Sequence, residues 1–176
     1  MSFEVLTNVF KEELNARELD DFFSDSPLWI FAGDRVFNEN ESTEVEQKIA
    51  DFTSNWLSHG QKVKPFGKLF FNRFIVLAAD SSSALPGGCS IDSSVRFIKS
   101  IETDFGVGLF DRMLVFWINE NDEIYSTKYS ELSGLLDSGG FTQDTPIFDM
   151  TVRTVEEFIA SWIKPASQSW LSRTLF

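Results

Sequence analysis

From residue 28 onward, apolar β-favouring runs alternate with segments whose apolar residues recur at helical spacing, and this order constrains the fold most strongly. The predicted strands cover 28–35, 62–71, 73–79, the two runs of a hairpin over 113–129, and 145–152. The predicted helices cover 42–58, 91–105, 130–138 and 154–163. The first six elements follow the order β-α-β-β-α-β. We therefore predict an α+β fold, in which an antiparallel sheet with helices packed on one face has a ferredoxin-like centre and a C-terminal extension.

The length of 176 residues fits one domain with an appendage. We predict that residues 1–25 form a peripheral N-terminal helix and that residues 26–176 form a single α+β domain. Phenylalanine supplies 19 residues, most of them at positions expected to face the core. Because a phenyl ring has no hydroxyl to satisfy, it fills the space between a sheet and its helices without a polar partner.

The net charge of −12, from 15 basic and 27 acidic residues, argues against binding to nucleic acid or to an anionic membrane surface. The N-terminus lacks the apolar run of a signal peptide, and no apolar run reaches the length of a membrane span. Cys89 is the only cysteine, so no disulfide can form within the chain. Together these features predict a cytoplasmic protein.

The segment from Pro86 to Ser94 links an apolar strand to an amphipathic helix and is the strongest candidate site. Its two glycines allow the backbone to approach a ligand closely, and Ser90 is expected to cap the helix. Cys89 would then lie beside the free N–H groups of the helix, which favour a thiolate or bind a small anion. The alternative is a structural turn in which Ser90 is only a cap and Cys89 is buried. The predicted ligand-binding residues are Gly87, Gly88, Ser90, Asp92, Ser93 and Arg96.

Thiol chemistry would use Cys89 as nucleophile or redox group and His59, the only histidine, as its base. His59 followed by Gly60 also fits the ordinary end of a helix. The spacing excludes a cysteine phosphatase, because six residues separate Cys89 from Arg96 where that loop has five. We predict no cofactor and no metal site, since one cysteine and one histidine cannot make the usual zinc sites. Asp80, Asp92 and Asp111 are the carboxylates from which a Mg²⁺ or Ca²⁺ site would have to be built, but they lack EF-hand spacing.

Several stretches of the chain resemble a small bacterial family of uncharacterised function, whose members are often labelled "ABC transporter ATPase". These stretches are WLSHG (56–60), NRFIVL (72–77), GCSIDSSVRFIK (88–99), LFDRM (109–113) and the closing residues 169–176. The GCSID segment is the most specific, and the resemblance covers most of residues 28–176. It implies a small stand-alone protein in which the segment around Cys89 is the functional or folding centre.

The ATPase label requires motifs that this chain does not have. Gly67-Lys68 resembles the end of a P-loop, but Leu69 follows where serine or threonine is needed. Asp80 ends an apolar strand as in a Walker B motif, yet Ser81 replaces the catalytic glutamate. We therefore predict a non-catalytic small-ligand or protein-binding module centred on residues 86–96. The alternative is a thiol-dependent enzyme or redox protein using Cys89, and a homodimer is compatible with either.

Overall fold

The structure is a computed structural model that describes residues 17–58, 61–62, 64–82 and 87–176. The chain divides into two compact units. Of the described residues, the first unit contains those within 17–111 together with 153–159, and the second contains 112–152 and 160–176. The single domain expected over residues 26–176 stays a prediction. Most of the predicted N-terminal helix lies outside the described residues. Its described part, 17–25, contains one short 3-10 helix, η2 (Arg17–Leu19).

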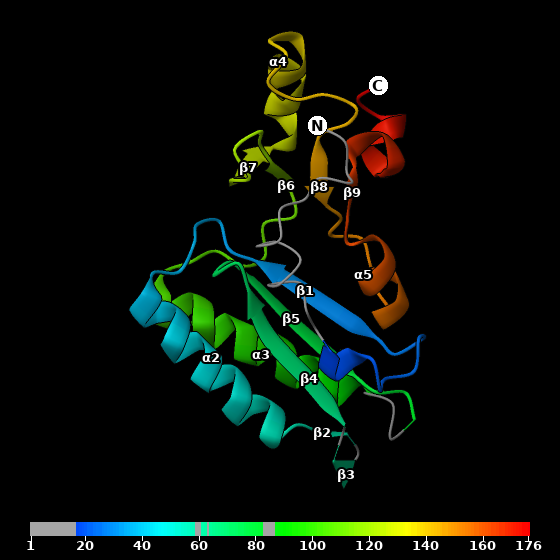
Figure 1. The fold of residues 1–176 in the computed structure, drawn as a ribbon. Coiled ribbons are helices and arrows are strands. Elements are labelled where there is room, and N and C mark those ends of the chain that lie inside the picture. The colour runs from blue at the N-terminus through cyan, green and yellow to red at the C-terminus, as the bar shows by residue number, and fades with distance from the viewer. Residues whose placement is uncertain (1–16, 59–60, 63, 83–86) are drawn as a thin grey trace. The chain divides into compact units, whose positions relative to one another are not determined.

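The first unit is built on a three-stranded antiparallel sheet (Figure 1). Its strands are β1 (Leu28–Ala32), β4 (Pro65–Phe70) and β5 (Phe74–Ala79), in the order β1-β5-β4. Helix α2 (Glu39–Ser54) connects β1 to β4, so these two strands run parallel with β5 inserted between them. Two further short strands, β2 (Leu57–Ser58) and β3 (Gln61–Lys62), form a separate hairpin.

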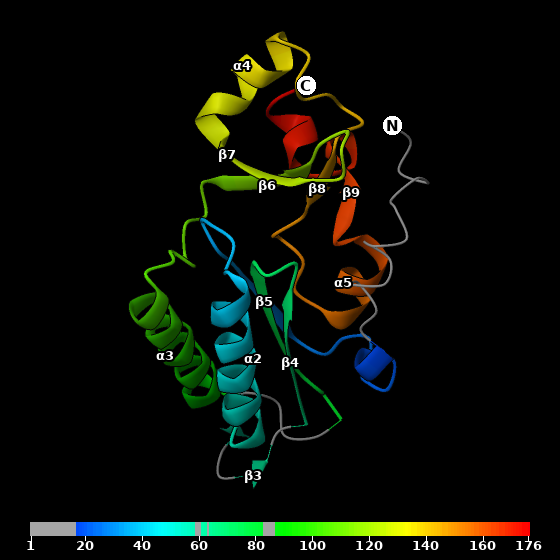
Figure 2. The same ribbon diagram turned by 60° about the vertical axis from the view of Figure 1, so that its left-hand side comes forward.

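Helices cover both faces of this sheet (Figure 2). On one face, α2 and α3 (Gly88–Phe105) enclose a core that includes Leu69 and Leu77. On the opposite face, Phe158 of α5 (Val155–Ser161) packs on Phe70, with the ring centroids 5.6 Å apart. The prediction of helices on one face only is therefore wrong for this unit. Because both faces are covered, β5 is buried along its whole length, which explains its continuous apolar run FIVLAA.

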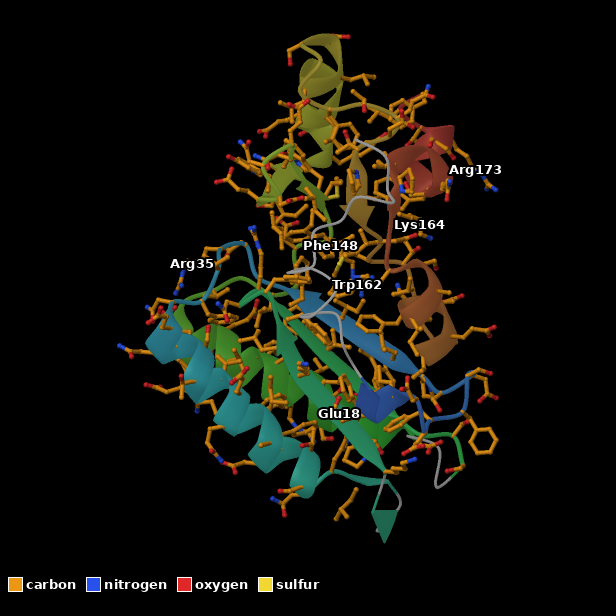
Figure 3. All side chains as sticks on the ribbon, viewed as in Figure 1. Glu18, Arg35, Phe148, Trp162, Lys164 and Arg173 are labelled. Atoms are coloured by element: carbon orange, nitrogen blue, oxygen red, sulfur yellow. The ribbon has the colours of Figure 1, made fainter. Side chains whose placement is uncertain are left out.

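Helix α2 has a well-defined beginning and a close contact with the sheet. Asn38 and Glu41 form a reciprocal capping box, and Glu41 also pairs with Arg35 (labelled in Figure 3) at 2.8 Å. Further along, α2 packs directly on the backbone of β4. A Cβ atom added to Gly67 would lie 2.6 Å from Ile49 Cγ2 and 2.7 Å from Thr53 Cγ2, so a larger residue there would force these side chains of α2 to shift.

The second unit holds a four-stranded antiparallel sheet in the order β7-β6-β8-β9. Its strands are β6 (Leu114–Ile118), β7 (Ile124–Lys128), β8 (Pro146–Phe148) and β9 (Ile163–Pro165). The hairpin predicted over 113–129 is confirmed as β6 and β7. Phe148 and Trp162, both labelled in Figure 3, meet edge to face with centroids 5.1 Å apart.

The remaining elements of the second unit are short helices around this sheet. They are η3 (Tyr129–Glu131), α4 (Leu132–Asp137), η4 (Ala166–Gln168) and η5 (Trp170–Arg173). One face of the sheet packs on Leu132 of α4, Ala166 of η4 and Leu171 of η5. The closing segment of the chain is thereby packed on the sheet of this unit.

The fold is mixed α+β with two antiparallel sheets, as the residue pattern predicts at the level of class. The ferredoxin-like arrangement is not confirmed. Its fourth strand would be β6, paired beside β1, but β6 pairs with β7 and β8 in the second sheet. Among the described residues, no helix combines the length and apolar character needed to cross a bilayer.

Candidate functional site

The candidate segment 86–96 forms the start of α3, and the helix begins earlier than the sequence predicts. Gly87 is the N-cap, with extended backbone (φ −81°, ψ 179°) and no side-chain cap. Its carbonyl accepts the N–H groups of Ser90 and Ile91 at 3.0 and 3.1 Å. The prediction of Ser90 as N-cap is wrong, because the extended Gly87 already starts the helix and places Ser90 inside the first turn. Pro86 lies outside the described residues.

Ser90 joins the first turn of α3 to the β2 strand. It is buried, and its Oγ–H donates to the carbonyl of Leu57 at 3.1 Å. Its own carbonyl accepts Trp56 Nε1–H at 3.1 Å and Ser93 Oγ–H at 2.7 Å. A hydroxyl has one proton to donate, so both serines have already used theirs on backbone carbonyls. This argues against an anion site made of the Ser90 and Ser93 hydroxyls.

Cys89, Asp92 and Arg96 are all exposed and lie along one side of α3, at positions i, i+3 and i+7. Gly88 faces open space, since a Cβ added to it would meet no heavy atom within 4 Å. The structural alternative that buries Cys89 is therefore wrong. The outward side of the first two turns of α3 presents a thiol, a carboxylate and a guanidinium to solvent.

Two large apolar side chains are exposed near the first turn of α3. Ile91 follows the buried Ser90 on α3 and is 38% exposed, and Leu57 of β2, whose carbonyl Ser90 contacts, is 47% exposed. We call Leu57 and Ile91 the apolar patch. Sequence reasoning missed Leu57, because the helical spacing over 42–58 predicts it on a buried face. In the structure α2 ends at Ser54, so Leu57 belongs to a strand.

The predicted catalytic base, His59, lies outside the described residues, as does Gly60. Its expected role at the end of a helix over 42–58 does not fit, since the C-cap of α2 is Asn55. The Cys89–His59 pair stays a prediction. Among the residues that the structure describes, no group of three or more His, Cys, Asp or Glu side chains is placed to hold a metal ion.

Asp80, considered above as a metal ligand, is instead held in a structural ion pair. The residue is 1% exposed, and its Oδ2 lies 2.9 Å from Lys64 Nζ. Its Oδ1 accepts the N–H groups of Ser82 and Phe23 at 2.9 and 3.4 Å. Burial by itself raises the pKa of this carboxyl, but these hydrogen bonds, that of Lys64 foremost, outweigh it and lower the pKa to about 2. Asp80 therefore anchors the chain around Phe23 to the end of β5.

The second unit contains a comparable pair that no sequence spacing indicated. Asp149, buried, lies 2.8 Å from Lys164 Nζ of β9 and accepts the N–H and hydroxyl of Thr151 at 2.9 and 2.6 Å. Burial raises the pKa of Asp149, and the bonds from Lys164 and Thr151 reverse this and lower it. The partners described here, Lys164 and Thr151, belong to the same unit as Asp149 and hold its carboxylate in place, which is typical of a structural ion pair.

No protein-family model, curated protein or solved structure matches the chain. The resemblance to the bacterial family stays a prediction, as does the cytoplasmic location.

Proposed function

We propose that this protein is a non-catalytic protein-binding module that contacts its partner through the apolar patch, with Asp92 and Arg96 as the charged rim. The proposal rests on one observation: Leu57 and Ile91 are exposed but carried on backbone that Ser90 and Trp56 hold in place. Because the backbone is already ordered, binding there costs less conformational entropy than ordering a loose loop. An apolar centre with a polar rim is the usual composition of a protein interface.

A protein partner fits these residues better than a small ligand does. Small molecules are held in concave sites that enclose most of their surface. Gly88 instead faces open space, and the hydroxyl protons of Ser90 and Ser93 are used within the protein. Cys89, Asp92 and Arg96 all project to solvent, which suits contact with a broad surface.

Replacing Leu57 and Ile91 together with glutamate is expected to weaken partner binding by about 100-fold, because each change places a charge in the apolar centre of the interface. The partner is first captured by a short photo-crosslinker on Cys89, the only cysteine. Its affinity for the unlabelled protein is then measured by calorimetry. Both exchanged residues are exposed, so circular dichroism should show an unchanged fold.

The matched control is Ile159→Glu, which places the same charge on an isoleucine of α5 that is 58% exposed. This variant should bind the captured partner with unchanged affinity. Equal affinity of the Leu57/Ile91 variant and the unaltered protein would contradict the proposal, and so would an equal loss in the control.

The exposure of Cys89 also makes the thiol-dependent alternative testable. If the protein is a binding module, Cys89→Ser should retain the partner affinity within about twofold, because the change replaces sulfur by oxygen and leaves Leu57 and Ile91 in place. Titration of the purified partner measures this. A thiol enzyme would behave differently: Cys89→Ser would abolish its activity, and native Cys89 would react with iodoacetamide far faster than a free thiol does.

A further inference from the structure

β1 forms one edge of the sheet in the first unit and, among the described residues, pairs along its length with β5 alone (Figure 1). The register decides which of its backbone groups face outward. Ala79 N–H donates to the Pro27 carbonyl, and Gly33 N–H donates to the Arg73 carbonyl, so the odd-numbered residues of β1 face β5. In an antiparallel pair the alternate residues point away from the partner strand. The N–H and C=O groups of Ile30 and Ala32 therefore face the open edge.

The N-terminal end of this edge already accepts another stretch of chain. Leu28 N–H donates to the carbonyl of Arg153 at 2.8 Å, and Pro27 forms an isolated antiparallel bridge with Thr154. The bridge stops there. No hydrogen bond joins the backbone of Ile30 or Ala32 to any residue that the structure describes. Backbone groups shielded from water are rarely left without a partner, and Ala32 is only 6% exposed, so this stretch of edge is suited to a further strand.

The two edges of the sheet differ in how they are protected. β4 carries Pro65 and Lys68, both of which discourage the addition of another strand. β1 has the sequence LWIFA, without proline or charge. Beside it, on the face of the sheet that α2 and α3 cover, Phe110 is 36% exposed and contacts Phe31 edge to face, with centroids 5.6 Å apart. An added strand would find apolar surface there for its alternate side chains.

We propose that β1 is a docking edge for an extended segment of a partner protein, which adds antiparallel to Ile30–Ala32 in line with the bridge at Thr154. Main-chain hydrogen bonds would supply the affinity, and the surface at Phe31 and Phe110 would select apolar, β-branched side chains at alternate positions. The segment is basic, because the chain carries a net charge of −12. The same charge on two copies disfavours self-association along this edge. This surface is separate from the apolar patch.

The probe is a synthetic peptide of alternating valine and threonine between terminal lysines, labelled for fluorescence polarisation. Its control is the same peptide with methyl groups on those backbone nitrogens that would face β1. Methylation removes the N–H donors needed for strand pairing and leaves the side chains unchanged. The parent peptide should bind and the methylated peptide should bind at least about tenfold more weakly. Amide exchange followed by NMR should show Ile30 and Ala32 exchanging rapidly in the free protein and slowly with peptide, while Trp29 and Phe31 stay protected in both.

Ile30→Pro provides the test from the side of the protein. Proline removes only the outward N–H, which the pairing with β5 does not use, so the strand should keep its place. This variant should bind the parent peptide about tenfold more weakly, whereas Ile30→Val, which keeps the N–H, should bind normally. If Ile30→Pro does not fold, the difference in affinity between the parent and the N-methylated peptide for the unaltered protein still tests the proposal.

Three results would overturn the proposal. The first is slow exchange of Ile30 and Ala32 in the free protein, and the second is equal binding of the two peptides. The third is a dimer in sedimentation that Ile30→Pro converts to monomer, since the occupant would then be a second copy. These readouts do not depend on the proposed function. If the Leu57/Ile91 variant bound its partner normally, the peptide results would be unchanged, because Leu57 and Ile91 lie on β2 and α3 and not on β1.

Discussion

Replacing Trp56 with alanine is expected to lower the free energy of unfolding by about 3–5 kcal/mol, the largest loss we predict for this protein. Trp56 is 2% exposed and contacts Trp29 edge to face, with centroids 5.9 Å apart, and Phe52 at 5.2 Å. Its Nε1–H also donates to the Ser90 carbonyl at 3.1 Å. Alanine would leave a cavity where α2, the sheet and the start of α3 meet, and would remove one of the two hydrogen bonds that hold Ser90 of α3 to Trp56 and Leu57.

The loss is measured by denaturant unfolding followed by circular dichroism, because the chain has 5 tryptophans and fluorescence would change with any of them. Trp56→Phe separates packing from hydrogen bonding. It keeps most of the ring and loses the N–H, so we expect a cost of about 1–2 kcal/mol. Trp170→Ala, at a tryptophan that is 39% exposed, should cost less than Trp56→Ala. A loss below about 1 kcal/mol for Trp56→Ala would contradict the packing described here.

Replacing Asp80 with asparagine is expected to destabilise the protein by about 1–2 kcal/mol at neutral pH, and the effect should disappear in acid. The pKa of Asp80 is about 2 in the folded protein and 3.8 without its partners. A group whose pKa is lowered by folding stabilises the protein above its unfolded pKa. This stabilisation is lost as the pH falls from about 4 through about 2. The expected value is kept small because Lys64 is exposed over 46% of its side chain, and water screens the pair.

The measurement is the free energy of unfolding of Asp80→Asn and the unaltered protein across that pH range. The two curves should lie apart at pH 7, approach each other below about pH 4 and converge only near or below pH 2. Asp92→Asn, at an exposed carboxylate of α3, is the control and should track the unaltered protein throughout. Curves for Asp80→Asn that stay equally far apart at every pH would contradict the ion pair. In that case the loss would come from packing alone.

Much of the fold could be predicted because it depends on local pattern. The continuous apolar run of 74–79 indicated a central strand, and helical spacing indicated α2 and α3. The paired β-rich runs at 113–129 indicated the hairpin of the second unit. In each case the residues that specify the element are neighbours in the chain, so their spacing alone is informative.

The candidate site was predicted only in part. Sequence spacing placed Cys89, Asp92 and Arg96 near the start of a helix, and all three project from α3. The role of Ser90 and the exposure of Leu57 were predicted wrongly, because they depend on where α2 ends and on which carbonyl lies within reach of Ser90. His59 cannot be placed, since it lies outside the described residues.

Tertiary structure alone decided which strands share a sheet. The order β-α-β-β-α-β is compatible with one four-stranded sheet, and the chain instead places β6 with β7, β8 and β9. Strand pairing is a contact between residues far apart in sequence, and its free energy comes from the surface buried on both sides, which no local pattern encodes. For the same reason, the apolar spacing predicted the helix α5 but not its position on the face of the sheet opposite α2. Composition and periodicity sufficed for an acidic α+β protein, whereas the two sheets, the exposed patch and the open edge of β1 follow from long-range packing.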